Sequence, residues 1–328
     1  MHNRKIFTVH RLRKKPKHFK SFTGLTPEEF DTLLKAVEPE YNSQQVTLKT
    51  QKTRQRKPGG GRNFKRNLAE RLLMTLIYYR LHLTFIMLGY LFDLDDSRAG
   101  EEIRERMQPV LLAVLPIPMR DRLFEVSNEN AVNQSVETTK QAPRVRTLEE
   151  LLEKYPEIKE VLIDATEQKV PRPEEKGKRR TRYSGKKKEH TIKTQVVTTK
   201  KLILHVSESI DGSVADMTLL RASGVMPSLG TKVKARVDRG FEGIEAAYPE
   251  QVIEKPIRGQ RGHHVTLLGK LWNQMVSKER ILVEHMLCKL EKFKILAGMY
   301  RANLNGYDDC FAVVAGLVNF KSMGKLAW

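Results

Sequence analysis

A short apolar run that ends in an acidic residue constrains this chain most. Val161-Leu162-Ile163 is typical of a buried strand, and Asp164 follows it directly. Burying an unpaired carboxylate is costly, so we expect Asp164 at the strand's end, where a metal ion, a hydrogen bond or water can satisfy it. Taken alone, Asp164 is more simply explained as a residue that ends a strand and begins a turn.

The residues after this run alternate between strand-like and helix-like patterns. Two alternating runs predict a hairpin that turns at Lys200-Lys201. A helix, a strand ending in Asp238, a short strand, a long helix and a final apolar helix then follow. This order predicts an α/β fold, a mixed sheet with helices on both faces. The expected segments are 191–197 and 202–206 for the hairpin, then 212–220, 232–238, 252–257, 267–296 and 308–320.

The N-terminal half predicts helices instead. Thr26 can cap a helix that has Pro27 at its first position. Residues 84–92, a turn at 93–96 and a second helix capped by Asp96 or Ser97 have a helix–turn–helix outline. Arg98 on that second helix is a candidate DNA contact, although its neighbouring acids make a simple packing helix an equally good explanation.

The loop-like composition of residues 116–147 predicts a linker between the two halves. The sequence contains no internal repeats. The expected organisation is a basic arm at 1–20, a helical DNA-binding domain at 21–115, the linker at 116–147, and a catalytic domain at 148–328.

The charge balance favours a polyanionic partner. The chain has 59 Lys and Arg against 39 Asp and Glu, a formal net charge of +20, and nucleic acid is the first candidate for such an excess. No apolar run of 18 or more residues and no signal peptide is present, so we expect no membrane association. Two cysteines in 328 residues predict a reducing, cytoplasmic setting.

Three segments concentrate the basic residues: 1–20, 49–66 and 176–188 each hold eight Lys or Arg. Such segments can follow a phosphate backbone, and solvated loops are the alternative. The candidate DNA contacts, besides Arg98, are Arg54, Arg56, Lys57, Arg62, Lys178, Arg179, Arg180, Arg182, Lys186, Lys187 and Lys188.

Asp164 and Asp238 each end a predicted strand. If those strands are neighbours, two carboxylates meet and repel each other unless cations bridge them. Mg²⁺ prefers such oxygen ligands, and a pair of ions can drive an in-line phosphoryl displacement. A third carboxylate can come from the long helix, where Glu279 and Glu284 are both candidates. Both have apolar neighbours, and periodicity does not choose between them.

The motifs around these acids resemble the DDE transposases of bacterial insertion sequences, in the Harbinger-related branch of insertion-sequence family five. The resemblance runs from about Leu25 to the C-terminus, including the 58–62 and 88–92 segments of its helical domain. Five motifs follow in order. They are Ile163-Asp164-Ala165-Thr166-Glu167, residues 183–195, Gly212-Ser213-Val214-Ala215-Asp216 with Ala215 in place of a histidine, Asp238-Arg239-Gly240-Phe241-Glu242-Gly243, and residues 280–285 around Glu284.

The resemblance implies an RNase H-like catalytic domain preceded by a helix–turn–helix domain. It implies Asp164, Asp238 and Glu284 as catalytic ligands of two Mg²⁺ or Mn²⁺ ions. The implied activity is DNA transposition: cutting at terminal inverted repeats and joining to target DNA, by a homodimer or larger assembly in the bacterial cytoplasm, associated with the nucleoid. Two alternatives stay open: a metal-dependent nuclease of the same fold without strand transfer, and an inactive DNA-binding derivative.

Overall fold

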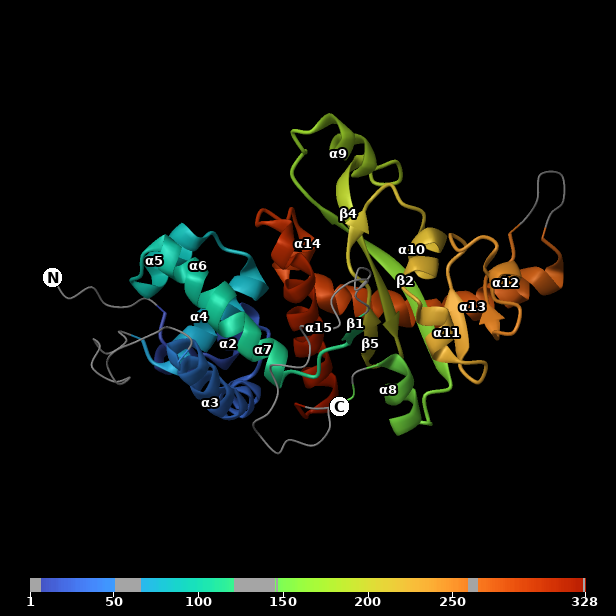
Figure 1. Cartoon of the computed structure of the whole chain (residues 1–328). Coiled ribbons are helices and arrows are strands. Elements are labelled where there is room, and N and C mark those ends of the chain that lie inside the picture. Colours follow the sequence, from blue (N-terminus) through green and yellow to red (C-terminus); the bar gives the residue numbers. More distant parts are fainter. Residues whose placement is uncertain (1–6, 51–65, 121–144, 146, 259–264, 327) are drawn as a thin grey trace. The chain divides into compact units, whose positions relative to one another are not determined.

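The structure is a computed structural model that describes residues 7–50, 66–120, 145, 147–258, 265–326 and 328. The side chains of residues 46–50 and 280 lie outside that description. The chain forms two compact units (Figure 1). The first contains residues 1–117, 290–298 and 303–327, and the second contains residues 118–289, 299–302 and 328. The domain boundaries expected from the sequence remain a prediction about which parts fold independently.

The first unit is helical. Its centre is α4, in which every residue from Glu70 to Tyr79 is buried, as expected for a helix covered on all sides. In chain order, the described elements of the first unit are α1 (Val9–Arg13), α2 (Pro16–Thr23), α3 (Pro27–Thr50), α4 (Leu68–Leu81), α5 (Phe85–Phe92), α6 (Asp96–Glu101), the π-helix η1 (Glu102–Met107), α7 (Gln108–Val114), α14 (Lys294–Ala297), the 3₁₀ helix η3 (Leu304–Gly306) and α15 (Tyr307–Met323).

Helix caps explain where several of these helices begin. The predicted start of α3 is confirmed: Thr26 and Glu29 form a reciprocal capping box, with N···O distances of 2.7 and 3.2 Å. The expected cap of α6 is wrong by one or two residues. Asp95 occupies that position, and Asp96 instead accepts a hydrogen bond from the Ser97 amide at 2.8 Å.

The second unit is a sheet with helices. Its elements are β1 (Met119–Arg120), α8 (Leu148–Lys154), β2 (Glu160–Lys169), α9 (Lys176–Thr181), β3 (Tyr183–Ser184), β4 (Glu189–Thr198), β5 (Ile203–Val206), β6 (Ile210–Asp211), α10 (Asp216–Ala222), α11 (Val225–Leu229), β7 (Lys234–Val237), α12 (Ile244–Ala247), β8 (Ile253–Glu254) and α13 (Leu267–Glu291). α13 enters the first unit only at its last residues.

The main sheet has the strand order β1-β5-β4-β2-β7-β8, and β3 and β6 pair with β4. β4 is antiparallel to both of its neighbours in this order, β2 and β5. β7 is parallel to β2, and β8 is parallel to β7. This mixed order is the RNase H-like fold that the sequence predicts. The sequence did not predict β1, which joins the edge of the sheet beside β5.

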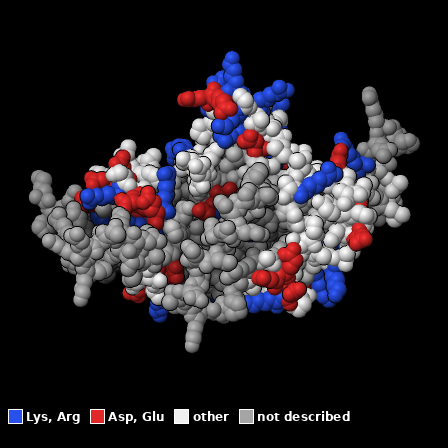
Figure 2. Space-filling model, viewed as in Figure 1, with Lys and Arg blue, Asp and Glu red and all other residues white. Residues whose placement is uncertain are grey.

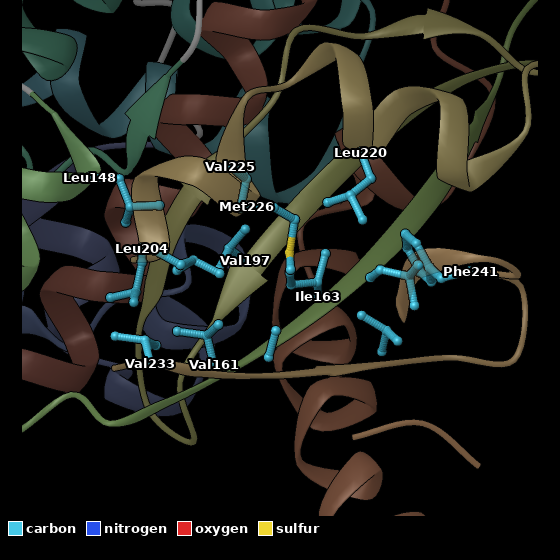
Figure 3. Close-up of a cluster of buried hydrophobic side chains, with 14 of the residues drawn as sticks. Leu148, Val161, Ile163, Val197, Leu204, Leu220, Val225, Met226, Val233 and Phe241 are labelled. Carbon is cyan, nitrogen blue, oxygen red and sulfur yellow. The ribbon is translucent and has the colours of Figure 1, made fainter. Parts of the chain in front are cut away.

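One face of the sheet carries the main hydrophobic core of this unit (Figure 3). Side chains alternate along a strand, and Val161 and Ile163 at the start of β2 lie in this core together with Ala235 and Val237 of β7. α8, α10 and α11 cover it, with Leu220 and Met226 among the contacts. Arg236 has the opposite parity and forms an ion pair with Glu279 of α13 at 3.1 Å. Helices therefore cover both faces, as predicted.

The position of Asp164 corrects a prediction. Asp164 does not end its strand, because β2 continues to Lys169 paired with β4. Only the parallel pairing with β7 ends at Ile163. The polar residues beyond it extend the strand because β4 supplies partners: Thr191 donates to Glu167 at 2.9 Å, and Lys169 pairs with Glu189.

Candidate functional site

Asp164 and Asp238 occupy equivalent positions on adjacent parallel strands. The last residue pair of the β2–β7 ladder is Ile163 with Val237; Asp164 is the next residue of β2, and Asp238 directly follows the end of β7. Neighbouring strands lie about 4.8 Å apart, so the two residues are close neighbours. The condition stated in the sequence analysis, that the strands of the two aspartates are neighbours, is met.

Local hydrogen bonds orient the two carboxylates. Asp164 Oδ1 accepts from the Ala165 amide at 2.8 Å, and Asp238 Oδ1 accepts from the Arg239 amide. Both residues are partly exposed. A pair of partly exposed carboxylates fits Mg²⁺, which is usually held by one or two carboxylates and completes its shell with water and substrate phosphates.

Glu284 lies on α13 and is exposed. The buried face of α13 runs through Val276, Val283, Met286 and Leu290. Leu282, next to Val283 in the chain, is only half-buried. Within the described residues, no three Asp, Glu, His or Cys side chains form a group able to hold a metal ion. Glu284 as third ligand therefore stays a prediction.

Glu279 has a different environment. Its carboxylate pairs with Arg236 at 3.1 Å and with Lys200 at 3.2 Å. Arg236 also pairs with Glu160 at 3.3 Å and with Glu254. Hydrogen bonds with Glu279 and then Glu160 raise the pKa of Lys200 above its usual value. Glu279 thus belongs to a network that ties α13 to β2, β7 and β8.

No pattern in the sequence indicates this network of ion pairs. Arg236 and Glu160 sit in strands whose alternate residues are apolar, and their partners lie far away in the chain. Strand alternation shows which residues share a face. It does not show which helix residue reaches them.

Residues 176–188, which we call the basic lobe, project from the β2 and β4 end of the sheet (Figure 1). Figure 2 shows Lys and Arg side chains gathered there, with a few acids among them. Some of the candidate DNA contacts hold the lobe together: Arg179 donates to the Pro173 and Glu174 carbonyls, and Arg182 pairs with Asp211 at 3.1 Å. Lys178 pairs with Glu175 at 2.8 Å on the surface. The other four candidates in the lobe, Arg180, Lys186, Lys187 and Lys188, are exposed.

The expected helix–turn–helix is present as α5 and α6. Arg98 is exposed and pairs with Asp95 at 3.4 Å. The acids that made this helix ambiguous are mostly neutralised: Glu102 is buried against Arg71 at 2.8 Å, and Glu101 pairs with Arg106 at 2.7 Å. Burial raises the pKa of Glu102 despite the opposing effect of Arg71. The candidates Arg54, Arg56, Lys57 and Arg62 lie outside the described residues.

Comparisons with known proteins agree with this description. Residues 163–319 match the sequence-family model "DDE superfamily endonuclease", and residues 67–116 match "Helix-turn-helix of DDE superfamily endonuclease". Together the fold, the paired aspartates and these matches define a DDE endonuclease with a helix–turn–helix segment. Residues 67–116 and 163–319 therefore belong to the DDE endonuclease superfamily, and the sequence is similar to that of an insertion-sequence transposase.

One similar curated protein is the "Probable transposase for insertion sequence element IS702" of Microchaete diplosiphon. It is 26% identical over 299 residues, which cover 90% of this chain and 95% of that protein. Among solved structures, a Mos1 transposase paired-end complex with the left transposon end aligns at 11% identity and a TM-score of 0.17, over 82% of this chain and 85% of that one. In the described part of the chain, no helix is long and apolar enough to cross a membrane.

Proposed function

We propose that this transposase cuts transposon ends at their terminal inverted repeats and joins them to target DNA. The observation that carries the proposal is the shared register of Asp164 and Asp238 on adjacent parallel strands of a DDE endonuclease fold. DDE endonucleases generally use divalent metal ions. Asp164 and Asp238, with Glu284 from α13, would hold two Mg²⁺ or Mn²⁺ ions, which stabilise charge on the attacking and leaving oxygens.

The chemistry consists of two phosphoryl transfers. In the first, a water oxygen forms a bond to phosphorus at the transposon end, and the P–O3′ bond breaks to release a 3′-OH. In the second, that 3′ oxygen attacks a target phosphorus, and the target's own 3′ oxygen leaves. The aspartate carboxylates would hold the divalent cations, and these cations would position the reacting phosphate. The carboxylates are fixed by the strand backbone and by the Ala165 and Arg239 amides.

The exposed basic residues would hold the DNA. Arg180 and Lys186–Lys188 of the basic lobe present positive charge on the same unit as the aspartates. Phosphate contacts of this kind fix the position of a duplex without reading its sequence. The helix–turn–helix, where Arg98 is exposed, would contact the bases and so recognise the DNA sequence.

Joining two ends at one target favours a homodimer or larger assembly on DNA, acting on the bacterial nucleoid in the cytoplasm.

A strand-transfer assay tests the proposal. The substrate is a duplex that ends in the terminal repeat flanking the coding region, already cut to expose its 3′-OH, and it is mixed with plasmid target and Mg²⁺. Joined products support transposition. Cleavage of uncut ends without joined products supports the nuclease alternative, and DNA binding without either product supports an inactive derivative.

A further inference from the structure

Lys193 is a buried lysine on β4, within the 183–195 motif, to which the sequence analysis assigns no role. Its residue is 6% exposed. Its Nζ lies 2.7 Å from Asp216 Oδ1, donates to the Val214 carbonyl at 2.6 Å, and lies 3.9 Å from Glu167 Oε1. A buried ammonium group is tolerated only when it is paired and hydrogen-bonded in this way. Lys193 therefore joins β2, β4 and the first residue of α10.

Asp216 connects this lysine to the loop that carries Asp238. A Cβ placed on Gly240 would lie 3.1 Å from Asp216 Oδ2. Gly240 comes two residues after Asp238, and this close approach leaves little room for a side chain. The loop is a tight turn, in which the Phe241 amide donates to the Asp238 carbonyl at 3.2 Å and the Phe241 side chain is buried. One carboxylate oxygen of Asp216 is thus held by Lys193, and the other borders the Asp238 turn.

The other side of the network leads to the strand of Asp164. Glu167 lies three residues after Asp164 on β2, and its carboxylate accepts from Thr191 Oγ1 at 2.9 Å. The Thr191 carbonyl in turn accepts from the Gly212 amide at 2.9 Å, which fixes the turn that leads to Asp216. The same group of buried side chains therefore contacts the strand of one aspartate and the loop of the other.

We propose that the Lys193–Asp216 pair is a positioning unit that fixes the Asp238 loop relative to β2, and so sets the separation of the Asp164 and Asp238 carboxylates. The proposal rests on the proposed function in so far as those carboxylates bind metal. Loss of Asp216 removes the group that borders Gly240 and leaves Lys193 without its nearest partner. The loop then loosens, and the metal affinity of the site falls.

The first experiment measures hydrogen exchange of the peptide containing Phe241 in the full-length protein. Asp216→Ala should speed exchange of the Phe241 amide by roughly tenfold or more, because the turn opens locally more often. The matched control is Ser223→Ala, which removes the 3.0 Å hydrogen bond from Gln195 of β4 to Ser223, the residue that caps the C-terminal end of α10. Ser223→Ala should lower the Tm and leave Phe241 exchange at the wild-type rate. Unchanged exchange in Asp216→Ala, or equal acceleration in both variants, overturns the proposal.

The second experiment measures the Mn²⁺ concentration for half-maximal cleavage of a transposon-end duplex. Asp216→Ala should raise it by about 10–100-fold, the range usual when a supporting residue of a metal site is lost, and Ser223→Ala should not change it. Faster exchange with an unchanged Mn²⁺ requirement would make the pair merely structural and overturn its positioning role. A wild-type protein that cleaves without any metal requirement refutes the proposed function. The exchange result then still decides whether the pair fixes the loop.

A double-mutant cycle tests the contact itself, with Asp216→Asn as a background that keeps the size of the side chain. Gly240→Ala places its Cβ against Asp216 Oδ2 and should speed Phe241 exchange in the wild-type background. In the Asp216→Asn background a side-chain atom still occupies that place, so the effect should persist. In Asp216→Ala it should disappear, because groups in contact are not additive. Equal effects of Gly240→Ala in all three backgrounds would contradict the contact.

Discussion

Glu279 and Glu284, five residues apart on α13, should respond to the same substitution in opposite ways. About 140° separates their directions at 3.6 residues per turn, so both cannot point at one metal pair. The Glu279 side chain is 35% exposed and joins the network of Arg236 and Lys200. Glu284 is exposed and follows the buried Val283 directly. A change to glutamine keeps the shape of each side chain and removes its charge.

Glu279→Gln should cost stability and little activity. The guanidinium of Arg236 is 12% exposed and still pairs with Glu160 and Glu254 after the change. The lost pair is partly exposed on the Glu279 side, so its contribution is at the upper end of the surface range, about 1 kcal/mol. For a unit of this size that lowers the Tm by roughly 2–4 °C. We expect cleavage to change only a few-fold.

Glu284→Gln should cost activity and little stability. Exposed substitutions usually change the free energy of unfolding by less than about 0.5 kcal/mol. If Glu284 is the third metal ligand, its loss should reduce cleavage by more than the roughly 10–100-fold typical of residues that only support ligands. Mn²⁺ in place of Mg²⁺ should restore a trace of activity.

Thermal unfolding and end cleavage, measured on both variants with the same duplex and the same metal concentration, decide the assignment. Each variant serves as the other's control, because both change a glutamate to a glutamine on one helix. An active Glu284→Gln beside an inactive Glu279→Gln would reverse the assignment and refute the structural role given to Glu279.

Three further outcomes follow from the described contacts. Affinity for duplex DNA should fall log-linearly and steeply between about 50 and 200 mM salt, because phosphate contacts release counterions; a flat titration would contradict an electrostatic interface. Thiol labelling of the folded protein should modify the exposed Cys288 and spare Cys310, since burial raises the pKa of the Cys310 thiol far above its usual value; labelling of both at equal rates would refute that burial. Gly89→Ala should destabilise the helix–turn–helix by about 2 kcal/mol, because the new Cβ would lie 2.5 Å from the Leu94 carbonyl oxygen; an unchanged Tm would show that the turn can shift.

The sequence predicted the order of the main strands along the chain, because that order depends on local periodicity. Periodicity left open whether the strands of Asp164 and Asp238 are neighbours, and the pairing of β2 with β7 shows that they are. The extension of β2 beyond Asp164 was not predictable. Its residues are polar, and they form a strand only because Thr191 and Glu189 of β4 supply partners. Local pattern carries no information about such cross-strand partners.

The same limit explains what was missed in and around the site. Glu279 and Glu284 have similar apolar neighbours in sequence, and only the tertiary contact with Arg236 separates their environments. In the sequence, Lys193 is indistinguishable from any polar residue of an alternating strand. It can be buried because Asp216 and the Val214 carbonyl, 21 to 23 residues later in the chain, pair with its ammonium group. Buried ion pairs between distant segments become visible only in the folded chain.

The most direct test of the central claim is metal-dependent cleavage of a transposon-end duplex by the Asp164→Asn and Asp238→Asn variants. Each asparagine keeps the shape of the side chain and removes the charge that would hold the cation. We predict that wild-type protein cleaves only with Mg²⁺ or Mn²⁺. Both variants should bind the duplex with unchanged affinity and show no cleavage at any concentration of either metal. Near wild-type cleavage by either variant under matched metal would contradict the assignment of the paired aspartates as the catalytic site.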